Sequence, residues 1–158
     1  MESKKEYVIS PDTMVIGPIY NENGYLHSIV MEVHTNYKIT KKPYKVMKDS
    51  CHYYGSNYNG IREATTQITG FKSKVPICIS HYLNLFFFPL ESPKNETCTW
   101  VSLAHIEKVI PVSPHVSTIK FTNGSEMQVP YSRGTIERNL GRTAYYRMLL
   151  MRRFESIG

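Results

Sequence analysis

An Asn-Gly pair flanked by two alternating stretches constrains the fold of this 158-residue chain more than any other feature. Apolar and polar residues alternate over residues 118–122 and again over residues 126–131, which is the period of a half-buried strand. Asn123-Gly124 lies between the two stretches, and this dipeptide favours the positive φ values that a tight turn requires. The sequence therefore predicts a β-hairpin closed by a two-residue turn.

Ser132 and Arg133 follow this hairpin and open a helix-like segment rich in arginine. At about 100° per residue, one side of that helix is apolar and the opposite side is basic. The apolar side holds Ile136, Leu140, Ala144, Met148, Met151 and Phe154, and the basic side holds Arg138, Arg142, Arg152 and Arg153. Arg147 projects within the apolar arc, which leaves three interpretations: a pair with a buried acid, a bend near Gly141, or an apolar face that is partly an interface.

Charge is distributed unevenly along the chain, whose formal net charge is +6 and whose sequence pI is near 9.2. Residues 133–155 hold six arginines against two glutamates, whereas residues 1–35 hold two lysines against five acids. Basic surfaces attract polyanions, nucleic acid first and anionic membranes second, although an arginine face can also be simply solvated. Arg133 at the end of the hairpin places a cation at the rim of a rigid sheet, where phosphate can be contacted.

The N-terminal residues 6–35 read as a β-meander, with β-type runs separated by Pro11-Asp12 and by a turn at residues 21–24. Two apolar runs within residues 71–90 read as buried strands, and Trp100 reads as a core anchor. His81 beside these strands is interpreted as a structural imidazole. Residues 92–98 form a loop.

Two central segments admit two interpretations each. The five lysines of residues 36–48 form either a solvated loop or a set of phosphate contacts. Residues 50–70 contain interleaved tyrosines, glycines and asparagines before a short helix at residues 61–68. Either the tyrosines pack on the core, or the helix start presents backbone N–H groups and Arg62 to a phosphate.

Several classes of protein are disfavoured by what the sequence contains. Three cysteines without paired spacing argue against a disulfide framework and a metal site, and for a reducing compartment. We expect no signal peptide and no membrane span, because no apolar run approaches about 20 residues. A nucleophile elbow and a phosphate-binding glycine loop are also missing, so we expect a soluble cytoplasmic protein that is not an enzyme and needs no cofactor.

Several blocks of the sequence together carry a family resemblance. They are CHYYGSNYNGIREATTQITG, KVPICIS, FFFPLESPKNETCTWVSLAHI, TIKFTNGSEMQVPYS and RTAYYR. Over roughly residues 7–150, these blocks resemble the competence transcription factor family, ComK, in the same order and at similar spacing. More distantly, residues 100–142 are similar to the second half of a LytTR-type DNA-binding domain, in which a strand, a hairpin and an arginine lead into a short helix.

The resemblance implies one DNA-binding domain over residues 1–158 with a β-rich α+β, LytTR-like fold of antiparallel strands and hairpins. Its parts would be the meander at 6–35, a central loop and short helix at 50–70, and the hairpin with an amphipathic C-terminal helix at 99–155. Two departures from the family pattern stand out. Longer members carry a C-terminal tail associated with regulated proteolysis, whereas this chain stops at Gly158, and Gly60-Ile61-Arg62 replaces the usual Gly-Arg.

The same resemblance implies a transcriptional activator of DNA-uptake genes in a Gram-positive bacterium. Such proteins bind paired A/T-rich boxes on double-stranded DNA as dimers or higher oligomers, largely through the minor groove, and RNA polymerase is a further partner to expect. The LytTR-like geometry implies insertion of loops into the major groove instead. An adaptor that acts through the Arg147-containing apolar arc and Met148–Met151, with only weak DNA binding, is the alternative.

On the DNA-binding interpretation, lysines and arginines displace counterions from the phosphate backbone. A narrow A/T-rich minor groove then attracts arginine, and flexible steps nearby allow the DNA to bend. Arg133 is the first candidate contact, and each candidate could also be an exposed solubilising side chain. The supporting candidates are Arg138, Arg142, Arg62, Lys72, Lys74, Asn57 and Asn123.

Overall fold

A seven-stranded sheet occupies the N-terminal part of the computed structural model, which describes residues 1–157. Its strands are β1 Glu2–Lys4, β2 Thr13–Tyr20, β3 Leu26–Glu32, β4 Asn36–Ile39, β5 Ile77–Ser80, β6 Leu85–Pro89 and β7 Trp100–Ser102. They lie in the order β1-β4-β3-β2-β7-β6-β5, and all neighbours are antiparallel except β1 and β4. Pairing of β2 with β7 joins the N-terminal strands to the apolar strands of residues 71–90.

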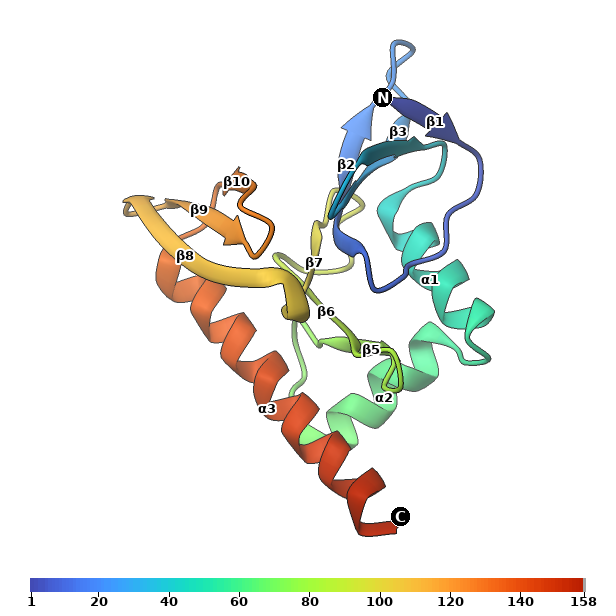
Figure 1. Cartoon of the computed structure of the whole chain (residues 1–158), viewed down its shortest axis with the longest axis vertical. Helices are drawn as coiled ribbons and strands as arrows, with labels where there is room; N and C mark the ends of the chain where they lie inside the picture. The colour runs from blue at the N-terminus through green and yellow to red at the C-terminus, as the bar shows by residue number, and fades with distance from the viewer. Residues whose placement is uncertain (158) are drawn as a thin grey trace.

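A smaller sheet and the helices complete the fold. The three-stranded sheet has the order β10-β9-β8, with β8 at Ile106–Ser113, β9 at Val116–Phe121 and β10 at Glu126–Val129. A 3₁₀ turn, η1 at Leu103–His105, links β7 to β8, and the α-helices are α1 Pro43–Tyr53, α2 Tyr58–Thr69 and α3 Arg133–Ile157. Figure 1 shows α3 starting beside the small sheet and running past α2 to the end of the molecule opposite the N-terminus. The fold is therefore α+β and rich in β-strands, as predicted.

The predicted hairpin is confirmed, with one difference in its turn. Strands β9 and β10 pair antiparallel, with Ile119 opposite Met127. The Gly124 N–H donates to the Phe121 carbonyl at 2.9 Å, and Gly124 is the residue of the pair with a positive φ, +90°. The turn therefore spans residues 122–124, the three-residue hairpin loop that places glycine in the left-handed region, and not the two-residue turn that the sequence predicts.

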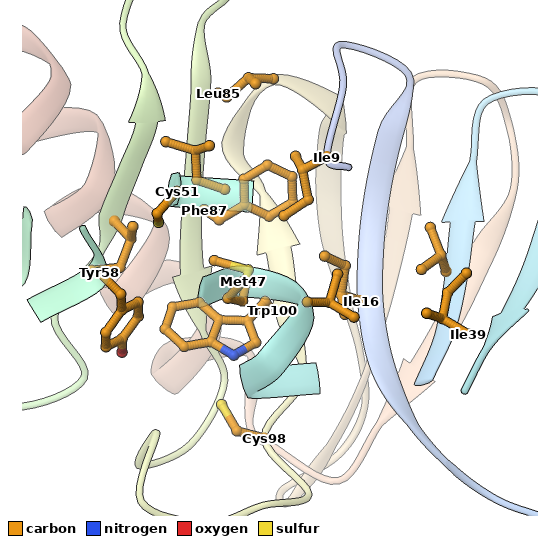
Figure 2. Close-up of a cluster of buried hydrophobic side chains, with 14 residues drawn as sticks. Ile9, Ile16, Ile39, Met47, Cys51, Tyr58, Leu85, Phe87, Cys98 and Trp100 are labelled. Carbon is orange, nitrogen blue, oxygen red and sulfur yellow. The ribbon is translucent and has the colours of Figure 1, made fainter. Parts of the chain in front are cut away.

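Strand β6 explains why the chain contains three consecutive phenylalanines. Successive side chains of a strand point to opposite faces of its sheet, and all three rings are at most 1% exposed. Phe87 packs with Trp100 and Met47 under α1, as Figure 2 shows. Phe86 and Phe88 point to the other face, toward α3 and the small sheet. The prediction of buried strands in this region is confirmed, and Trp100, 1% exposed, is a core residue as expected.

Three features of the N-terminal half differ from the sequence-based expectation. The first run of the predicted meander is not a strand. Its Ile9 is bonded instead to α1 and to the residue that caps that helix: the Ile9 N–H donates to Ser50 Oγ, and the Tyr54 hydroxyl donates to the Ile9 carbonyl. The lysine-rich segment is not a loop but forms β4 and the start of α1, whose Val46 and Met47 are fully buried. Residues 50–70 contain the end of α1 and all of α2, so this segment is more helical than the short helix at residues 61–68 that the sequence predicts.

Helix α3 begins at Arg133 as predicted, but it buries a different face. Its buried residues are Ile136, Asn139, Thr143 and Tyr146, whereas Ala144, Met148 and Phe154 of the predicted apolar side are exposed. At about 100° per residue, the buried face is rotated by roughly a quarter turn from the predicted one. The hydrophobic pattern did not predict this face because two of its buried residues, Asn139 and Thr143, are polar. Thr143 can be buried because its Oγ1 donates a hydrogen bond to the Asn139 carbonyl at 2.7 Å, within the helix.

Arg147 needs neither a buried acid nor a bend near Gly141. Its Nε donates to Asn84 Oδ1 at 2.8 Å, in the turn between β5 and β6. The guanidinium also lies 5.9 Å from the centre of the Phe86 ring. An amide oxygen and an aromatic face thus hold this cation at the edge of the contact between α3 and the large sheet.

Candidate nucleic-acid interface

A cleft lined by cations lies between the start of α1, the first turns of α2 and two loops, and we call it the basic cleft. Its volume is about 690 Å³. Six cationic residues line it: Lys42, Lys45, Arg62, Lys72, Lys74 and Lys94. Glu96 is the single acid among the described residues that line it. A concave site of one charge sign concentrates the electric field and attracts ligands of the opposite sign.

Most of this charge is not neutralised by the protein itself. Lys42 pairs with Glu96 at 2.6 Å, and Lys45 pairs with Asp49 of its own helix at 2.8 Å. The other four cations, Arg62, Lys72, Lys74 and Lys94, form no ion pair within residues 1–157. The basic cleft therefore has a surplus of positive charge that an anionic ligand can neutralise.

Local sequence signals bring two walls of the basic cleft together. Asn57 caps α2, because its Oδ1 accepts the Gly60 N–H at 3.1 Å, and this fixes the helix start that carries Arg62. Gly70 ends α2 in the left-handed conformation, with φ +80°. The loop at residues 71–76 then turns into β5 and presents Lys72 and Lys74 to the cleft.

Helix α3 contacts the same loop from outside the cleft. Nη2 of Arg142 donates to the Ser73 carbonyl at 2.7 Å, and the guanidinium lies 4.2 Å from the centre of the Phe71 ring. Desolvation, and then the nearby Arg138, lower the pKa of Arg142, which therefore lies in an environment short of negative charge. Arg138 is exposed one turn earlier in the helix. The 71–76 loop thus presents lysines to the cleft and accepts a hydrogen bond from Arg142 of α3.

The structure brings five of the eight predicted site residues into this region and leaves three outside it. Arg62, Lys72 and Lys74 line the basic cleft, Arg142 contacts its loop, and Arg138 is near Arg142 on α3. Arg133 is paired with Glu137 one turn further along α3, on the side of the helix roughly opposite Arg142.

The two predicted asparagines use their side chains within the fold. Asn57 is the cap of α2. Asn123 Oδ1 accepts the Ser125 N–H at 3.0 Å, and its Nδ2 donates to the Val33 carbonyl at 2.9 Å, which ties the hairpin turn to the end of β3. Both side chains are exposed; the polar atoms of Asn123 and the Oδ1 of Asn57 already have partners within the protein.

Sequence reasoning did not select Lys42, Lys45, Lys94 or the tyrosines of the basic cleft. Lys42 and Lys45 belong to the segment for which a phosphate-contacting role was one of two interpretations. They lie three positions apart, Lys42 as the N-cap residue of α1 and Lys45 in the first turn of that helix. Lys94 sits in the loop between β6 and β7. Tyr44 and Tyr58 pack edge to face with ring centres 5.0 Å apart, and burial, followed by the neighbouring Tyr44, raises the pKa of Tyr58.

The cysteines are the remaining reactive side chains, and all three are buried. Cys51, Cys78 and Cys98 are free and buried, and burial raises their pKa values to about 11, 12 and 12, so they are thiols at neutral pH. Among residues 1–157 no group of three or more histidines, cysteines or acids is placed to hold a metal ion. Likewise, no helix in that range has the length and apolar character needed to cross a membrane.

Comparison with known proteins gives two matches. A family model described as "ComK protein" matches residues 4–155. The chain is also similar to a protein named "Competence transcription factor" from Bacillus subtilis (strain 168), with 27% identity over 143 residues, which is 90% of this chain and 74% of that protein. No solved structure matches the chain, so the LytTR-like geometry stays a prediction.

Proposed function

We propose, because the chain belongs to the ComK family, that it is a competence transcription factor that binds double-stranded DNA and activates genes of DNA uptake. The name of the Bacillus subtilis relative supports the same role. On this proposal the chain works by binding and not by catalysis, and it acts where the promoters are, on the nucleoid.

The observation that carries this proposal is the convergence of cations at the basic cleft. Helices α1 and α2 and two loops each contribute cations, and α3 adds Arg142 at the 71–76 loop, with Arg138 near it. Neutralising phosphates with such residues releases counterions, which supplies affinity that depends steeply on salt but not on sequence. The cations of the cleft and of α3 are therefore the backbone-contacting part of the interface.

Selectivity for paired A/T-rich boxes needs a second kind of contact, one that depends on the DNA sequence. A narrow A/T-rich minor groove concentrates negative potential and attracts arginine. Arg62 and Arg138 are exposed and have no ion-pair partner within residues 1–157, so they can enter a groove without breaking a contact. Arg133 must first leave Glu137. We therefore place Arg62 and Arg138 ahead of Arg133 as groove contacts.

Paired boxes imply two copies of the protein on DNA, and the second half of α3 offers a surface where they can meet. Met148 and Phe154 are 40% and 42% exposed, although they lie on a helix packed against the body of the molecule. Contiguous exposed apolar surface marks protein interaction sites. The Phe154 ring also stacks on His81, so we take Met148 as the centre of the contact between copies. An adaptor function would use this same surface, and it predicts weak DNA binding at every sequence.

The proposal is tested by fluorescence anisotropy with a labelled A/T-box duplex and a scrambled G/C-rich duplex in physiological salt. Lys72→Ala/Lys74→Ala should weaken binding to both duplexes by the same factor and lower the salt slope by about two, because two phosphate contacts are lost. Arg138→Ala should instead reduce the preference for the A/T box.

Lys108→Ala is the matched control, because Lys108 is an exposed, unpaired lysine on β8 within the described residues and lies outside the basic cleft. It should bind both duplexes like the wild type. If the double variant is folded and binds with unchanged affinity and salt slope, the basic cleft is not the DNA-binding surface. Equal and weak binding of both duplexes by the wild type would favour the adaptor.

A further inference from the structure

The interior of the basic cleft has the size of a small-ligand site. Its volume of about 690 Å³ falls within the roughly 300–1,000 Å³ typical of pockets that hold small molecules. A DNA duplex presents its phosphates on a convex surface, and even the wider groove of B-DNA is about 12 Å across. A duplex can therefore contact the rim of the cleft, whereas the interior fits a smaller anion.

The cations of the basic cleft come from separate parts of the chain. Arg62 comes from α2, Lys72 and Lys74 come from the loop before β5, and Lys94 comes from the loop between β6 and β7. None of these four has an ion-pair partner within residues 1–157. Unpaired lysines and an arginine that line one cleft match a compact polyanion with several phosphate groups.

One wall of the basic cleft is aromatic and apolar. Tyr44 is 37% exposed and lies edge to face with Tyr58, which in turn packs edge to face on Trp100 of the core with ring centres 6.0 Å apart. Val75 and Pro93 line the same cleft. This chain of rings holds Tyr44 rigidly, and a rigid exposed ring is a platform on which a nucleobase can stack. A ligand of phosphate alone would leave this wall uncovered.

We propose that the basic cleft binds a free nucleoside triphosphate. The base lies against Tyr44, and the phosphates lie between Arg62, Lys74 and Lys94. Because Glu96 is already paired with Lys42, the protein offers no unpaired carboxylate in the cleft for a magnesium ion, so its own cations neutralise the phosphates. As a consequence that rests on the proposed function, the bound nucleotide competes with DNA for Lys74.

Isothermal titration calorimetry of the DNA-free protein in EDTA tests the site directly, with ATP, GTP and inorganic tripolyphosphate as probes. ATP and GTP should bind more tightly than tripolyphosphate. Tyr44→Ala should weaken nucleotide binding between about fivefold and 150-fold, the range of base–aromatic stacking, and leave tripolyphosphate unchanged. Tyr44→Phe, which keeps the ring, should bind nucleotides like the wild type, and Arg62→Ala should weaken all three ligands.

The inference is overturned if ATP and GTP do not bind, if tripolyphosphate binds as tightly as they do, or if folded Tyr44→Ala binds them unchanged. The competition is measured separately, by displacement of labelled A/T-box DNA with ATP. Loss of DNA binding in Lys72→Ala/Lys74→Ala without any nucleotide binding would remove the nucleotide site and keep the proposed function. If the protein binds nucleotides but does not bind DNA, the nucleotide site is kept and the proposed function is removed.

Discussion

Lys74 has a backbone conformation that few side chains tolerate. Its φ is +48°, in the left-handed region, and it lies in the loop that the basic cleft shares with the contacts of α3. A non-glycine residue there costs of order 1 kcal/mol, and such strain is often found at binding sites. The buried Val75, 2% exposed, follows directly and anchors the loop. Lys74 therefore places a positive charge at a position where a glycine would make the folded protein more stable.

We accordingly expect opposite effects of Lys74→Gly on stability and on binding. The free energy of unfolding should stay the same or rise by up to about 1 kcal/mol, since glycine adopts this φ without strain. The DNA affinity should fall and the salt slope should drop by about one. Urea denaturation and anisotropy measure the two quantities.

Lys72→Gly is the matched control for this experiment, because it removes the same charge from the same loop at a residue without a positive φ. It should weaken DNA binding and also lower stability. A Lys74→Gly protein that is less stable but binds DNA normally would contradict the assignment of Lys74.

Asn57 was selected from the sequence as a DNA contact, and in the structure its side chain caps α2. Its Oδ1 caps α2, so Asn57→Ala should lower the free energy of unfolding by about 1 kcal/mol. Asn57→Ser keeps an acceptor for the Gly60 N–H and should restore most of that loss. Thermal denaturation gives the stabilities. If Asn57→Ala is as stable as the wild type but binds DNA weakly, the side chain is a contact and not a cap.

At the scale of single elements, sequence reasoning succeeded where the signal was local. The Asn-Gly turn, the apolar runs of β5 and β6, and the start of α3 after Ser132 all depend on neighbouring residues. Helix α1 was missed because its buried Val46 and Met47 are surrounded by lysines. The orientation of α3 was missed because Asn139 and Thr143 lie on its buried face, where an apolar pattern cannot mark them.

Substitutions on α3 distinguish the observed face from the predicted one. Tyr146 is 2% exposed and packs on Phe86, so Tyr146→Ala should lower the free energy of unfolding by about 3 kcal/mol. Met148→Ala should change it by less than about 0.5 kcal/mol, because Met148 is exposed. The reverse order in urea denaturation would mean that α3 packs with the face that its hydrophobic pattern predicts.

The same helix allows a test of assembly on DNA. Met148→Glu places a charge on the exposed apolar surface of α3 without disturbing the buried face. We expect it to remain folded and to bind a single box like the wild type. On paired boxes, its complex should contain fewer copies, as measured by light scattering. Unchanged assembly would exclude this surface as the contact between copies.

At the scale of the whole molecule, the interface results from contacts that are distant in the sequence. Val15 of β2 pairs with Val101 of β7, and this pairing fixes the N-terminal strands and α1 relative to the segments that follow. Residue type alone identified Lys72, Lys74 and Arg62 as candidates. Lys42 and Lys94 line the same cleft because of tertiary packing, which no local sequence pattern encodes. For the same reason the sequence did not show that Arg133 lies outside the cleft and pairs with Glu137.

Lysine footprinting tests the central claim, that the basic cleft is the DNA-binding surface, most directly. The wild-type protein is acetylated with and without an A/T-box duplex, and the modified lysines are identified by mass spectrometry. We predict that DNA protects Lys72, Lys74 and Lys94, whereas Lys108 on β8 reacts equally in both samples. Protection of Lys108 and Lys120 with unchanged reaction at the three cleft lysines would place the DNA on the small sheet and contradict this account.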